Sequence, residues 1–261
     1  MRAFFVSPTP SFRVNQTPVK DAIEKSPYFW WWYALTLNAE YSALCEQKDV
    51  GRAKRPKTDA EKAMHQLYKD WGDVRYQGDR YRAFAKWFSR PVGKGHTVGT
   101  WLFGEPPLSM SVRLVKSGAD AEALLANGGA FLVAIPRRMR RDYLDRRLNA
   151  IFKKDLVVVK GRAVRDPRTS RALYHLTKAA VPATLKKAFD LYDAKQKALT
   201  SGEKLSNTDL FKNAGLKYIQ KIKDEEKLKG AAKRRVISML VSRHIKNANA
   251  MIKHAALAQF P

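Results

Sequence analysis

Residues 26–45 read SPYFWWWYALTLNAEYSALC and form the most aromatic segment of the chain. Ser26 suits the N-cap of a helix, and Pro27 suits its first position. Apolar residues then recur at spacings of three or four, which predicts one buried helical face made of Trp30, Tyr33, Leu37, Tyr41 and Leu44. We therefore expect one helix from Pro27 to about Cys45 that anchors an aromatic core.

The second and third tryptophans leave two interpretations open. On a helix of about 100° per residue, Trp32 points about 200° away from Trp30, so it needs a second partner or is exposed. If they are exposed, Trp31 and Trp32 are candidate stacking residues for the bases of single-stranded DNA or RNA. The alternative is that the whole run packs into a core, as the spacing of Trp30 indicates.

The composition indicates a folded, basic protein. The 261 residues include 50 Lys and Arg against 24 Asp and Glu, a formal charge of +26, and 45% are hydrophobic and 11% aromatic. This content excludes a fully disordered chain, and the single cysteine excludes a disulfide-stapled secreted domain. No apolar run approaches the roughly 20 residues of a membrane span, and the N-terminal apolar stretch is too short for a signal peptide.

From these features we expect a cytoplasmic protein that avoids membranes and binds a polyanionic partner. That partner is nucleic acid, DNA before RNA, and homo-oligomerisation is left open. The charge is uneven: residues 1–136 carry 19 basic and 13 acidic side chains, and residues 137–261 carry 31 and 11. Because an ordinary soluble surface mixes both signs, the second half is the expected polyanion-binding part.

We predict an α+β fold that is predominantly α-helical and has three parts. Residues 1–108 form an aromatic-rich helical region, which opens with an extended arm and includes helices over residues 59–71 and 81–88. Residues 109–168 form a small basic α/β unit. Residues 169–261 form a basic helical region with a candidate helix-turn-helix and a long terminal helix.

The small α/β unit is predicted from short alternating segments. Strands are expected over residues 110–115, 131–135 and 156–159, each bounded by turn residues or proline. Helices are expected over residues 120–126 and 140–153. The strand over residues 131–135 is fully apolar, so we expect it to be buried.

Residues 205–216 match part of a helix-turn-helix. The hydrophobic and turn positions are occupied by Leu210, Ala214, Gly215 and Leu216. Phe211 departs from the motif, because a small residue normally lets the two helices approach there, and Lys221 stands where an apolar residue is usual. A short helix capped by Asn207 or Thr208 and ended by glycine also arises from ordinary capping, so both interpretations stay open.

The terminal helix, expected to reach about Gln259, has two opposite faces. One is apolar and contains Ile237, Leu240, Val241, Ile245, Ala248, Met251, Ile252 and Ala255. The other carries a polar row of Arg235, Ser242, Lys246, Asn249 and Lys253, which Arg243 flanks. Such side chains reach phosphates and base edges, so the row is a candidate DNA contact. The alternative is an ordinary amphipathic helix with a solvated basic face.

A second candidate contact is rich in arginine. It consists of Arg137, Arg138, Arg140, Arg141, Arg146 and Arg147, and the loop that follows adds Arg162, Arg165 and Arg168. The rigid fork of arginine suits phosphate. The alternative is a solvated helix in which Asp142 and Asp145 supply local ion pairs.

The sequence contains no recognisable catalytic or metal site. One cysteine and five scattered histidines give no metal-ligand spacing, and residues 93–97, GKGHT, lack the Ser or Thr that follows the lysine of a P-loop. We therefore expect no metal, no cofactor and no enzymatic activity.

Two segments together resemble a group of uncharacterised bacterial proteins associated with phages and integrative elements. They are SPYFWWWYAL at residues 26–35, followed by Asn38 and Tyr41, and VSRHIKNA at residues 241–248, which runs on to QFP at residues 259–261. The resemblance implies a mobile-element context, supplies no activity, and favours a role on DNA.

We therefore predict a non-enzymatic double-stranded DNA-binding protein that serves a mobile element as a transcriptional regulator or replication accessory factor. Three alternatives are retained. They are a single-stranded DNA or RNA binder with exposed tryptophans, a nucleic-acid-processing enzyme whose site has no known motif, and a structural protein with an acidic protein partner.

Overall fold

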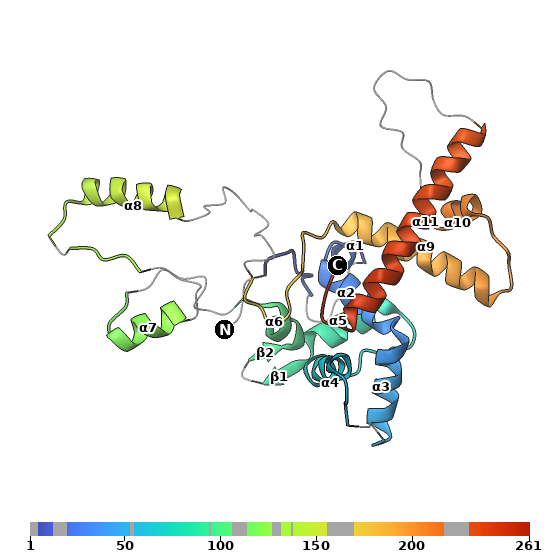
Figure 1. The fold of residues 1–261 in the computed structure, drawn as a ribbon, viewed down its shortest axis with the longest axis horizontal. Helices are drawn as coiled ribbons and strands as arrows, with labels where there is room; N and C mark the ends of the chain where they lie inside the picture. Colours follow the sequence, from blue (N-terminus) through green and yellow to red (C-terminus); the bar gives the residue numbers. More distant parts are fainter. Residues whose placement is uncertain are drawn as a thin grey trace.

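The chain is predominantly helical, as predicted (Figure 1). A computed structural model describes residues 5–12, 20–52, 55–93, 95–105, 114–126, 132–136, 138–155, 170–216 and 230–261. Within these ranges the chain forms eleven helices and one small antiparallel sheet of two strands.

The elements up to the sheet follow one another closely. They are α1 (Lys20–Glu24), α2 (Pro27–Thr36), α3 (Ala39–Asp49), α4 (Asp59–Trp71), α5 (Arg80–Ser89), β1 (Pro91–Gly93) and β2 (His96–Thr97). The remaining elements are α6 (Val98–Phe103), α7 (Gly118–Ala126), α8 (Arg141–Asp155), α9 (Pro182–Thr200), α10 (Asn207–Asn213) and α11 (Gly230–Ala255).

The aromatic segment forms two helices, so the prediction of one helix up to Cys45 is wrong. The break lies at Asn38, whose side-chain oxygen accepts a hydrogen bond from the backbone N–H of Tyr41 (2.9 Å) and so caps α3. The amide nitrogen of Asn38 also donates to the backbone carbonyl of Ile252 (3.0 Å). One side chain therefore starts α3 and ties it to α11.

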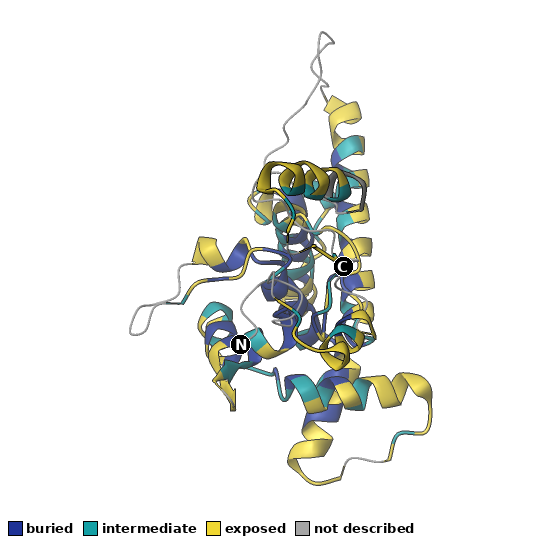
Figure 2. Ribbon diagram, turned by 90° about the vertical axis from the view of Figure 1, so that its left-hand side faces the viewer, coloured by how far each residue is buried: buried dark blue, intermediate teal, exposed yellow. Residues whose placement is uncertain are grey.

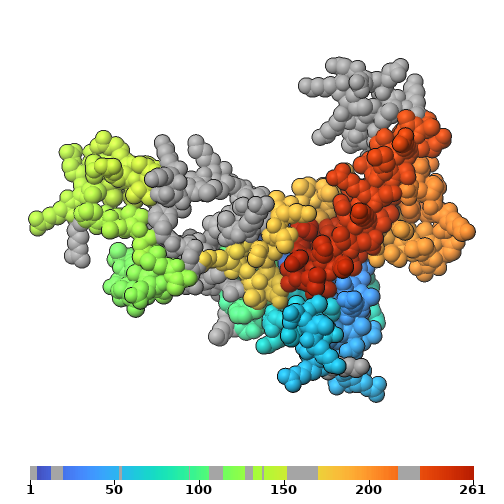
Figure 3. Space-filling view, viewed as in Figure 1, coloured from blue at the N-terminus to red at the C-terminus, as the bar shows by residue number. Residues whose placement is uncertain are grey.

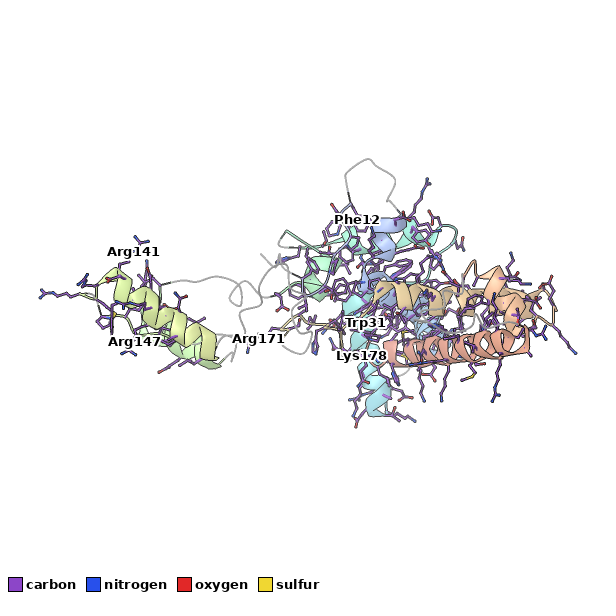
Figure 4. All side chains as sticks on the ribbon, turned by 90° about the horizontal axis from the view of Figure 1, so that it is seen from above. Phe12, Trp31, Arg141, Arg147, Arg171 and Lys178 are labelled. Carbon is purple, nitrogen blue, oxygen red and sulfur yellow. The ribbon has the colours of Figure 1, made fainter. Side chains whose placement is uncertain are left out.

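The three consecutive tryptophans are the centre of the main core. Trp30, Trp31 and Trp32 are each 1% exposed or less, because α2 is covered on all sides. Trp30 stacks on Phe189 of α9, with ring centroids 5.5 Å apart. Trp31 stacks on Phe260 near the C-terminus, at 5.6 Å and an interplanar angle of 14°. Figure 4 shows Trp31 inside the main body of the molecule.

The main core therefore joins the first and third of the predicted regions. A second, smaller core lies between α9, α10 and the N-terminal half of α11, and contains Leu191, Ala198, Leu210, Phe211, Ile237, Val241 and Ile245. Helix α11 contributes to both cores, since its Ala248, Met251 and Ala255 pack into the main one. The region boundaries themselves stay a prediction.

A charged network links the helices around the main core. The Glu24 carboxylate on α1 is 8% exposed. It accepts hydrogen bonds from the Tyr81 hydroxyl (2.6 Å) and from the Lys186 ammonium (3.0 Å). Lys186 also pairs with Asp190 at 3.1 Å. Elements α1, α5 and α9 are thus held together by polar contacts as well as by apolar packing.

The central region differs from the predicted α/β unit. Its two helices are confirmed as α7 and α8, but residues 132–136 form no strand, and Leu132 and Ile135 are 40% and 49% exposed. The prediction of a buried strand over residues 131–135 is therefore wrong for its described residues. Helices α7 and α8 lie apart from the main body in Figure 1, and among the described residues no sheet or helix layer covers residues 132–136.

The two other predicted strands fall largely outside the described residues. Of the first, only residues 114–115 are described, and they are not in a strand. The third, over residues 156–159, lies wholly outside. The sheet that does form is the β1–β2 pair, where Pro91 pairs with Thr97 and Gly93 with His96.

Candidate nucleic-acid interface

Helix α11 is the element that carries the predicted polar row. Its apolar face is buried through Ile237, Val241, Ile245, Ala248, Met251 and Ala255, as the spacing predicted. Burial of that face against α2, α9 and α10 fixes the direction in which the opposite face points. Residues 230–235 are all exposed (Figure 2), so the N-terminal turn of α11 extends beyond the helices that pack against the rest of it.

All six members of the predicted row are exposed, namely Arg235, Ser242, Arg243, Lys246, Asn249 and Lys253. Arg235 and Lys253 lie eighteen residues apart in the sequence, which corresponds to about 27 Å along the helix axis. Figure 3 shows α11 crossing one face of the molecule, with α9 and α10 beside it. We call this row the α11 face.

The α11 face is positively charged without local compensation. Residues 227–261 contain no Asp or Glu. Within the described ranges, no carboxylate comes within ion-pair distance of Arg235, Arg243, Lys246 or Lys253. Uncompensated cations on one helix raise the local positive potential and attract polyanions.

His244 lies on the same helix but is half-buried, and it lies near enough to Lys187 of α9 to interact with its charge. Burial lowers the pKa of its imidazole, and the nearby charges of Lys187 and Arg243 lower it further. The ring is therefore neutral at pH 7, and the charge of the α11 face comes from its arginines and lysines.

A groove lies beside the α11 face. Its volume is about 590 Å³, and Ser242, Lys246 and Asn249 of α11 form one wall of it. Lys195 of α9 and Lys204 of the α9–α10 connection also line this groove. Sequence reasoning missed both lysines, because they belong to other elements and no periodicity links them to α11.

The arginine cluster lies on and just before α8, far from α11. Arg138, Arg140, Arg141, Arg146 and Arg147 are exposed. Asp142 lies 3.4 Å from Arg140 and 3.7 Å from Arg146, so part of this cluster has the local ion pairs that the alternative interpretation expected. Arg137, Arg162, Arg165 and Arg168 lie outside the described residues.

The two basic surfaces do not merge. Helix α8 lies on one side of the main body and α11 on the other in Figure 1, and Figure 4 shows Arg141 and Arg147 well away from the helices of the core. We therefore do not expect one short duplex segment to contact both the arginine cluster and the α11 face. The α11 face is the stronger candidate, because two cores hold its helix in place.

The stacking prediction for Trp31 and Trp32 is wrong in this structure, because both side chains are buried. Trp32 packs against Tyr76, Phe84 and Trp87, with ring centroids 5.2, 5.5 and 6.3 Å away. These rings are the second partner that its outward direction required. Neither indole offers a face to a base.

Only the first helix of the candidate helix-turn-helix, α10, lies within the described residues. Helix α10 is capped by Ser206 rather than by Asn207 or Thr208, and Gly215 follows it with a φ of 65°. Phe211, which departs from the motif, is buried in the second core. The second helix of the motif would fall on residues 217–229, outside the described residues, so the motif stays a prediction.

The described residues also bear on metal sites and membrane spans. In that part of the chain no three His, Cys, Asp or Glu side chains gather as metal ligands would. No helix there is both long and apolar enough to cross a membrane.

Comparison of the chain with protein-family models, with curated proteins and with solved structures finds no match. The resemblance to the mobile-element group therefore stays a prediction.

Proposed function

We propose that this chain is a non-enzymatic protein that binds double-stranded DNA through the α11 face. The observation that supports this most is the combination of rigid support and uncompensated charge. One side of α11 is fixed by two cores, while Arg235, Arg243 and Lys246 on the other side are exposed and have no carboxylate partner among the described residues.

The dimensions and chemistry of the α11 face suit a duplex. An α-helix with its side chains is about 10–12 Å across, and the major groove of B-DNA is about 12 Å wide. Arginine and lysine neutralise phosphates and release counterions, while Ser242 and Asn249 have the hydrogen-bonding groups that reach base edges.

Duplex DNA is favoured over single strands, because Trp31 and Trp32, the residues predicted to stack on unpaired bases, are buried. The role as a regulator or replication accessory factor of a mobile element rests on the sequence resemblance alone. The α11 face supports DNA binding and does not distinguish between a regulator and a replication accessory factor.

The test is a salt-titrated binding assay of the full chain against a duplex DNA, its single strands and an RNA of equal length, followed by fluorescence anisotropy. We expect the duplex to bind most tightly, with an affinity that falls steeply as salt rises. Absence of duplex binding, or tighter binding of the single strands, contradicts the proposal. Incubation of plasmid with the protein and Mg²⁺ or Mn²⁺ tests the non-enzymatic part, which nicking would contradict.

A further inference from the structure

The groove beside the α11 face brings together lysines from three different elements. Lys195 comes from α9, Lys204 from the α9–α10 connection and Lys246 from α11, and all three line one groove of about 590 Å³. Glu203 is the acidic side chain of the described lining, and none of the three lysines is ion-paired within the described part of the chain. Three lysines against one glutamate leave the groove with a net positive charge, which favours binding of an anion.

The neutral groups of the groove suit a phosphodiester. Ser242, Asn249 and Asn207 add hydrogen-bonding side chains to its lining. The Asn207 amide donates to the Ser238 hydroxyl at 2.7 Å, which holds the start of α10 against α11 and so fixes the shape of the groove. Phosphate oxygens accept hydrogen bonds from lysine, serine and asparagine alike.

Five of the twelve described lining residues of the groove are apolar, namely Ala198, Leu199, Leu205, Leu210 and Ile245. Ala198, Leu210 and Ile245 are buried in the second core, which leaves Leu199, at 62% exposed, and the half-buried Leu205 as the accessible apolar side chains. Such a surface covers the carbon edge of a sugar. It offers too few apolar side chains for the row of anchors with which an amphipathic helix fills a groove.

The groove and the α11 face are continuous, because Ser242, Lys246 and Asn249 belong to both. We propose that the groove holds the phosphate backbone of one DNA strand next to the major groove that α11 enters, an inference that rests on the proposed function. Lys195 and Lys204 then act as backbone-positioning residues. They contribute affinity equally for every duplex sequence, whereas α11 carries any preference for particular bases.

The experiment compares two variants of equal net charge. Lys195→Gln/Lys204→Gln removes the two lysines that only the groove uses, and Lys57→Gln/Lys86→Gln removes two exposed lysines from elsewhere on the surface. Duplex binding is measured from low to high salt on two unrelated sequences.

We expect the negative slope of log K against log salt to become shallower by about 2 in the groove variant, because each lost phosphate contact removes about 0.9 from its magnitude. The affinity loss is tens-fold at about 0.1 M salt on the same relation, and it is equal for both duplexes. The control variant keeps nearly the wild-type slope.

Three results overturn the inference in distinguishable ways. If the groove variant and the control share one slope and one affinity, the groove has no role, although the proposed function stands. If the groove variant keeps the control's duplex slope but loses binding to polyglutamate, the groove takes an acidic protein instead. If the wild-type chain binds no duplex, the inference and the proposed function fail together.

Discussion

Phe260→Ala tests whether the C-terminal end of the chain belongs to the same core as the N-terminal aromatic helix. The Phe260 ring is fully buried and stacks on Trp31. Burying a phenylalanine contributes about 1.5–3 kcal/mol, and an aromatic pair adds about 0.5–1.5 kcal/mol. The cavity left by the truncation brings the expected loss to about 3–5 kcal/mol, a large part of the about 5–15 kcal/mol that stabilises a typical domain.

The assay is urea unfolding of the full chain, followed both by tryptophan fluorescence and by far-ultraviolet circular dichroism. Phe260→Leu, which keeps most of the apolar volume, should lose far less, and Gln259→Ala at the exposed neighbouring position should lose almost nothing. We expect Phe260→Ala to shift both signals together. A loss below about 1 kcal/mol, or a shift confined to one signal, would refute the claim of a shared core.

Two further predictions concern the main core. In Gly99→Ala, the new methyl group would lie 2.3 Å from the Phe88 ring, so we expect overpacking to lower the free energy of unfolding by about 1–3 kcal/mol in urea. The control is Gly118→Ala, whose methyl group meets nothing within 4 Å. Equal stability of the two variants would refute the contact. Burial opposes the charged form of Glu24, but hydrogen bonds from Tyr81 and Lys186 outweigh it and lower the carboxyl pKa below 4.5. The contribution of Glu24 to stability is therefore present above pH 4.5 and lost as the pH falls through the folded pKa. Glu24→Gln should destabilise the chain at pH 7 and flatten the acid limb of its pH–stability curve. An unchanged acid limb would contradict this prediction.

Several helices could be predicted from sequence because their signals are local. Helix α4 has the predicted bounds, and Thr58 and Glu61 form its capping box. The apolar stripe of α11 followed from the spacing of its residues. The break at Asn38 was missed although the residue is a good N-cap, because apolar periodicity continued past it as far as Leu44.

The sequence contains a second signal, besides apolar periodicity, which indicates that Trp32 is buried. Nine of the ten residues of α2 are buried, and a helix that is apolar on all sides belongs inside a core rather than at its surface. The partners of Trp32 are Tyr76, Phe84 and Trp87. Because these rings are distant from Trp32 in the sequence, only the tertiary structure identifies them. The apolar run at residues 131–135 was misleading for the opposite reason. A strand needs a neighbouring strand for its ladder of hydrogen bonds, and no described strand pairs with residues 132–135.

The candidate site was predictable where one helix carries it and unpredictable where several elements do. The α11 face follows from a single period, and its six side chains are all exposed. Lys195 and Lys204 approach it only because α9 and α10 pack against α11 through the second core. No spacing along the chain encodes that approach.

The most direct measurement of the central claim is the salt dependence of duplex binding in Arg235→Ala/Arg243→Ala/Lys246→Ala. The matched control is Arg52→Ala/Arg55→Ala/Lys57→Ala, which removes two exposed arginines and one exposed lysine between α3 and α4. We expect the α11 variant to lose most of its duplex affinity, and its negative slope of log K against log salt to become shallower by about 3. The control should keep nearly the wild-type affinity and slope. Equal slopes and affinities in the two variants would contradict the assignment of DNA binding to the α11 face.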